Sequence, residues 1–97
     1  MLARVFTVTM KPDLLETAIA EWPRATSVFK GKGLIAGYMI LMDRKACKVM
    51  SVTLWESEAA IERNLNSPEL KNVMAHFRTF FASEPKIEQC EVPASVV

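Results

Sequence analysis

The chain has 97 residues, and 12 Lys and Arg against 11 Asp and Glu give it a net charge of +1. This length suits one domain, and a near-neutral balance lacks the positive field of a general nucleic-acid binder. Hydrophobic residues make up 51% and charged residues 24%, which argues against intrinsic disorder. We therefore expect residues 1–97 to form a single globular domain that does not bind nucleic acid.

Cysteine and histidine are scarce. Cys47, Cys90 and His76 are too few and too scattered for a structural zinc site, so we expect no metal. The longest apolar run, residues 34–42, is about half a membrane span. The first residues have no basic segment followed by a long apolar run, so we expect no signal peptide. These features predict a cytoplasmic protein that does not enter a membrane. Its thiols should be free, with Cys90 packed and Cys47 exposed in a turn.

The first third of the chain predicts a strand and a helix. Residues 2–10 are rich in β-branched and aromatic types and favour a strand. Pro12 followed by Asp13 is typical of a helix start, because proline suits the first helical position and the acid complements the helix dipole. An apolar stripe continues to residue 29, and we expect Pro23 to kink or restart this helix.

The remainder predicts a hairpin, two helices and a last strand. Residues 34–42 and 49–55 favour strands joined by a polar loop, and residues 86–92 favour a final strand. Ser57 is expected to cap a short helix, and Ser67 before Pro68 to cap a longer one. Pro85 should close that longer helix, whose expected buried residues are Leu70, Val73, Met74, Phe77 and Phe81.

The order β-α-β-β-α-β predicts a ferredoxin-like α+β fold with a four-stranded antiparallel sheet. Residues 34–42 contain eight apolar residues and one glycine, so both faces of this strand need cover. The next strand likewise places Val52 on one face and Val49 on the other. Two helices can cover only one face of such a sheet. We therefore expect a homodimer that packs sheet against sheet.

Three stretches carry a family resemblance: GLIAGY at residues 33–38, SVTLWES at 51–57 and NSPEL at 66–70. With them the chain resembles the antibiotic biosynthesis monooxygenase family of the dimeric α+β barrel superfamily, over most of its length. The resemblance implies pairing as a dimeric α+β barrel. It also implies a function among cofactor-independent oxygenases of aromatic polyketides, haem-degrading enzymes and proteins without known activity.

The haem-degrading branch does not match residue by residue. Its Asn, Trp and His positions fall near Val5, at Asn64 and at Met74, and none carries the required residue. His76 lies two residues beyond the ligand position, which is about 200° around the helix. We therefore expect no haem and no other cofactor.

The cofactor-independent branch needs an apolar pocket, an aromatic wall, and a base or hydrogen-bond donor. The resemblance places such a pocket between sheet and helices. The expected substrate is a small quinol-type or anthrone-type aromatic. Its candidate walls are Tyr38, Trp55, Phe77 and Phe81, with softer walls from methionine, and His76 is the candidate catalytic base.

Each candidate also has a structural interpretation. His76 lies on the flank of its helix, where a solvated histidine is the commoner case, and the aromatic residues are typical of a core. The sequence leaves the hairpin register open, and with it whether Tyr38 and Trp55 share a face. Three hypotheses follow: a cofactor-independent monooxygenase, a non-catalytic small-molecule-binding dimer, and a structural dimer without a ligand site.

Overall fold

The structure is a computed structural model that describes residues 1–96, and its element order confirms the ferredoxin-like α+β prediction. Within these residues, all neighbouring strands are antiparallel and lie in the order β2-β3-β1-β4. The strands are β1 (Leu2–Thr9), β2 (Leu34–Asp43), β3 (Lys48–Trp55) and β4 (Lys86–Glu91). The helices are a 3-10 turn η1 (Pro12–Leu14), α1 (Leu15–Ser27), α2 (Glu58–Leu65) and α3 (Pro68–Arg78).

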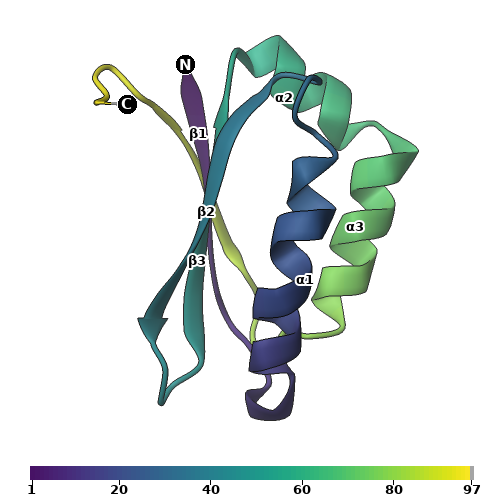
Figure 1. Cartoon of the computed structure of the whole chain (residues 1–97), viewed down its shortest axis with the longest axis vertical. Helices are drawn as coiled ribbons and strands as arrows, with labels where there is room; N and C mark the ends of the chain where they lie inside the picture. The colour runs from purple at the N-terminus through teal and green to yellow at the C-terminus, as the bar shows by residue number, and fades with distance from the viewer. Residues whose placement is uncertain (97) are drawn as a thin grey trace.

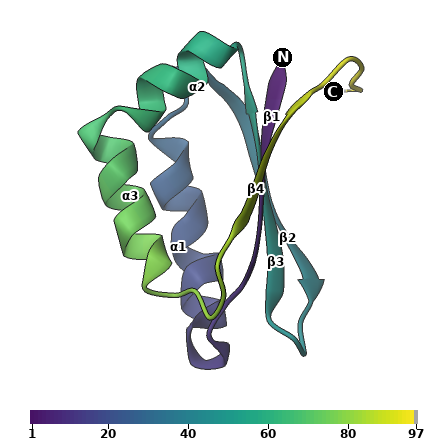
Figure 2. The same ribbon diagram turned by 180° about the vertical axis from the view of Figure 1, so that it is seen from behind.

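The molecule has two layers. Figure 1 shows the sheet nearly edge-on, with α1, α2 and α3 on one side of it and no helix on the other. Figure 2 shows the same division from behind, with β4 in front and the C-terminal segment rising beside the N-terminus. Among the helices described, none has the length and apolar character needed to cross a bilayer.

Serine caps set the starts of α2 and α3. The hydroxyl of Ser57 accepts from the backbone N–H of Ala60 at 3.1 Å, and that of Ser67 accepts from Leu70 at 3.2 Å. Pro68 follows the second cap at the first helical position, where its missing N–H costs nothing. Both predicted caps are confirmed.

Two helices differ from their predictions. Pro23 lies inside α1, which continues to Ser27, so the helix does not restart there. Proline removes one backbone hydrogen bond, but Trp22 and Ala25 on either side of Pro23 pack against the hydrophobic core, and this packing stabilises the helix. Helix α3 ends at Arg78, so Phe81 lies beyond it. There the chain pairs with the end of β1, where the Ala82 N–H donates to the carbonyl of Thr9 at 2.8 Å.

The two cysteines are also placed contrary to expectation. Cys47 is buried because the loop after β2 folds back, and its carbonyl accepts from the Met10 N–H at 2.8 Å. Cys90 is exposed because it lies in β4, an edge strand, on the face that no helix covers. Both are free thiols.

Candidate functional site

A mostly apolar cavity of about 100 Å³ lies between the helix-covered face of the sheet and the helices. Its floor is made by alternate residues of β1, β2 and β3, because the side chains of a β-strand alternate between the two faces of the sheet. The floor includes Arg4, Phe6, Met39, Val49, Ser51, Thr53 and Trp55. The cover comes from α1, α3 and the turn after α3, and includes Trp22, Thr26, Val73, Met74, Phe77 and Phe81.

The hairpin register decides which aromatic side chains reach this cavity. Tyr38 pairs with Val52, and Gly37 pairs with Thr53, so Tyr38 and Trp55 point to opposite faces. Trp55 is buried over the cavity, whereas Tyr38 is 58% exposed on the uncovered face. The structure thus brings Trp55, Phe77 and Phe81 together and leaves Tyr38 out, which corrects the expectation that Tyr38 lines the same pocket.

A glycine makes room for a second tryptophan that the sequence analysis did not select. The Trp22 ring lies over β2 at Gly37, where an added Cβ would be 3.1 Å from a ring carbon. Its indole N–H donates to the hydroxyl of Ser51 at 3.2 Å. The cavity is therefore walled by two indoles, one from each layer.

Hydrogen bonds to the neighbouring strand residues fix the indole of Trp55. Its N–H donates to the Thr53 hydroxyl at 2.9 Å, and that hydroxyl donates to the carbonyl of Arg4 at 3.4 Å. This bond occupies the Trp55 N–H, which is therefore not free to orient a ligand. The indole therefore offers a ligand its face.

Arg4 is the one ionisable side chain among the described residues that line the cavity. It is half-buried, and within residues 1–96 its guanidinium has no hydrogen-bond or ion-pair partner. Burial lowers the pKa of this guanidinium, because desolvation penalises the charged form. An arginine nevertheless stays protonated near neutral pH. The sequence signal was available: Arg4 interrupts the inward-facing set Leu2, Phe6 and Val8 of β1.

His76 does not reach the cavity. It lies near the end of α3 with its side chain 55% exposed, and its Nε2 is 3.2 Å from a carboxylate oxygen of Glu21 on α1. The ring also packs edge-on against Phe80, with centroids 5.0 Å apart. The histidine thus bridges the outer surfaces of two helices, and the structure gives it no contact with the space where a substrate would lie.

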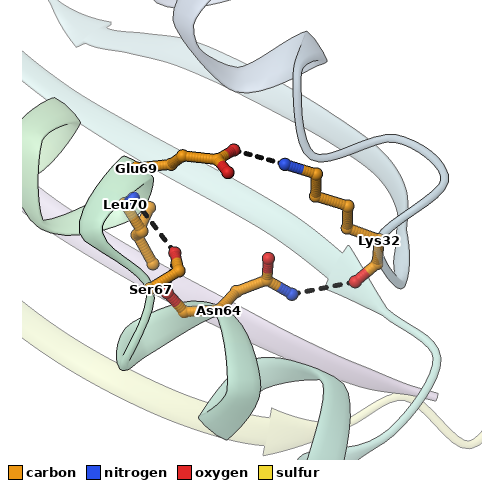
Figure 3. A network of polar contacts seen from close by, with 5 residues as sticks. All are labelled: Lys32, Asn64, Ser67, Glu69 and Leu70. Atoms are coloured by element: carbon orange, nitrogen blue, oxygen red, sulfur yellow. Dashed lines mark hydrogen bonds and ion pairs between the residues drawn. The ribbon is translucent and has the colours of Figure 1, made fainter.

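A polar network fixes the end of the cavity where α3 begins. Figure 3 shows the buried Asn64, whose side-chain N–H donates to the carbonyl of Lys32 at 2.8 Å. Ser67, which caps α3 through Leu70, also donates to the carbonyl of Asn64 at 2.6 Å. An ion pair joins Lys32 to Glu69 above this bond. Leu70 also lines the cavity, so these bonds hold its cover against the loop that precedes β2.

Solved structures similar to this chain include one of an antibiotic biosynthesis monooxygenase, at TM-score 0.78 and 10% identity, with 97% of this chain and 100% of that chain covered. The resemblance first seen in the three sequence stretches is confirmed at the level of the fold.

Two further solved structures share this fold. A mutant of SnoaB, a cofactor-independent oxygenase from Streptomyces nogalater, matches at TM-score 0.77 and 15% identity, covering 98% of this chain and 95% of its own. The NE2512 protein of unknown function from Nitrosomonas europaea matches at 0.79 and 21%, covering 99% and 92%. No family model matches the sequence. No curated protein matches it either. At these identities the likeness establishes the fold, and the activity has to be argued from the cavity.

Proposed function

We propose that this protein is a homodimer that binds a small flat aromatic molecule in the cavity and oxygenates it with O₂ without a cofactor. The observation that carries the proposal is the cavity itself. Two indoles, Phe77 and Phe81 surround it, and both indole N–H groups are already bonded within the protein. Such walls present π-faces, which favour an aromatic ring.

This oxygenation needs few catalytic groups from the protein. An anthrone that has lost a proton can itself reduce O₂. One oxygen atom replaces the two hydrogens of its CH₂ group as a carbonyl, and the other oxygen leaves with those hydrogens as water. The substrate supplies all four electrons, so no external reductant is needed. The protein has to hold the anion, admit O₂ and exclude bulk water.

A direct test is oxygen uptake with a panel of hydroquinones and anthrones. We expect faster uptake than in buffer for at least one compound, with one atom of ¹⁸O₂ in the product. Phe77→Leu removes a cavity wall, while Phe80→Leu is the matched control, because Phe80 is 6% exposed but does not line the cavity. Uptake should fall at least fivefold in the first variant only. Uptake equal to buffer for every compound would contradict an oxygenase acting on this panel.

A second candidate is a binding module that uses the same cavity without turnover. The specific observation in its favour is that, of the described residues lining the cavity, none is an acid, a histidine, a lysine, a tyrosine or a cysteine. No general base is therefore in place among them. This candidate predicts saturable quenching of tryptophan fluorescence by an aromatic compound with no consumption of oxygen.

The uncovered face of the sheet supports the proposed homodimer. Across its centre, Tyr38, Val52 and Val5 lie side by side on neighbouring strands. The apolar residues Ile40 and Met42 continue the surface along β2, and they are 46% and 45% exposed. The charged side chains of this face lie at its margins, at the start of β3 and along the edge strand β4. A second copy related by a two-fold axis presents the same apolar surface, so each copy covers the other.

A further inference from the structure

The position of Arg4 distinguishes this cavity from a purely apolar one. Its side chain lies on the helix-covered face of β1, between Phe6 and Leu2. Its direct cross-strand neighbours on that face are Thr53 of β3 and Gln89 of β4, and both are neutral. A positive charge thus lies at the floor of the cavity with no negative charge beside it in the ladder.

The acid that β4 contributes to this face, Glu91, does not neutralise the charge of Arg4. Glu91 is the diagonal neighbour of Arg4 in the β1–β4 pair and is exposed. No ion pair joins the two side chains, although ion pairs elsewhere in residues 1–96 are formed. A half-buried cation without a counter-charge is unfavourable, and a ligand that supplies the negative charge would remove that penalty.

We propose that Arg4 makes the cavity selective for aromatic ligands that carry an oxyanion, namely a ring carboxylate, a phenolate or an enolate. This inference rests on the proposed function, since it assigns a charge to the ligand of the same cavity. The planar guanidinium can donate two parallel hydrogen bonds to a carboxylate, or two converging ones to the single oxygen of a phenolate or an enolate. The indoles and Phe77 hold the ring, and the apolar walls strengthen the charge interaction.

The same contact addresses the absence of a base among the described lining residues. A guanidinium beside a phenol or an enol favours its ionised form, because an opposite charge stabilises the anion. The ionised form is the one that gives electrons to O₂. The substrate can thereby give its proton to solvent as it binds and enter the cavity as the anion, without a side chain that accepts the proton.

The test compares matched anionic and neutral ligands on the full-length protein. 2-Naphthoate is titrated against 2-naphthamide, and benzoate against benzamide, with the fluorescence of Trp22 and Trp55 as the signal. We expect the wild-type protein to bind each carboxylate at least tenfold more tightly than its amide at low ionic strength. Arg4→Met, which keeps much of the side-chain volume, should abolish this preference. Arg4→Lys keeps the positive charge but not the planar pair of N–H donors, and it should retain part of the preference for carboxylate.

Glu91→Gln is the control variant, because it removes the diagonal acid of β4 on this face and Glu91 does not line the cavity. It should keep the full preference for carboxylate. Equal affinity for carboxylate and amide in the wild-type protein, or a preference that survives in Arg4→Met, would overturn the inference and leave the aromatic site standing. Binding of none of the four compounds would instead overturn the aromatic site together with it. Melting curves check that each variant is folded, and if Arg4→Met does not fold, Arg4→Lys alone decides by whether the preference falls.

Discussion

A charge placed at the centre of the uncovered sheet face should separate the two copies of the proposed dimer. Val52 lies between Val5 and Tyr38 in the central row of that face and is half-buried before any partner covers it. In Val52→Lys, an ammonium would have to leave water without a counter-charge, at a cost of several kcal/mol. The two-fold axis brings in two such charges per dimer. We expect a total loss of about 5 kcal/mol, or about 10³–10⁴-fold in the dissociation constant.

Sedimentation velocity at micromolar concentration measures this directly. The wild-type chain should sediment at twice the monomer mass of 10.9 kDa, and Val52→Lys at the monomer mass. Asn72→Lys is the matched control, because it adds the same charge at an exposed position of α3, away from the sheet. A wild-type protein that is monomeric at these concentrations would refute the dimer. A Val52→Lys variant with an unchanged dissociation constant would show that this face is not the interface.

Three further outcomes are expected. Gly31 and Gly33 both have positive φ, 87° and 104°, and replacing Gly31 by alanine should lower the free energy of unfolding by about 1 kcal/mol. The same change at Gly33 should lower it by about 3–4 kcal/mol, because the new Cβ would lie 2.5 Å from a methyl group of α2. Equal losses in urea unfolding would contradict this packing. In the monomeric sheet variant a thiol reagent should modify Cys90 rapidly and Cys47 only on unfolding, and comparable rates would contradict their placement. His76→Ala should change oxygen uptake less than twofold, and a loss of tenfold or more would restore this histidine as the catalytic base.

The local features of the fold could be predicted from the sequence. The strand bounds and the starts of α2 and α3 depend on β-branched runs and on Ser57 and Ser67 as caps, which act over three or four residues. The excess of apolar residues in residues 34–42 also predicted a sheet with two apolar faces, and the uncovered face carries Tyr38 and Ile40.

The composition of the cavity could be predicted only in part, because it depends on long-range register. The β2–β3 pair has irregularities between Leu34 and Ala36 and between Leu41 and Asp43, and no local signal reports such shifts. The resulting register decides that Tyr38 faces away from Trp55. Arg4 was missed for a different reason. Alternate residues of a strand share one face, so Arg4 lies on the same face as Leu2, Phe6 and Val8, and its charge stands out only when these four positions are compared.

An aromatic ligand in the cavity between the sheet and the helices is the central claim. The most direct test fills that cavity with protein: Val73→Phe adds a ring from α3 into the space, and binding of 2-naphthoate is followed by isothermal titration calorimetry. We expect affinity at least tenfold weaker than wild type, with a melting temperature that is unchanged or raised. Unchanged affinity in a folded Val73→Phe protein would place the ligand elsewhere and contradict the claim.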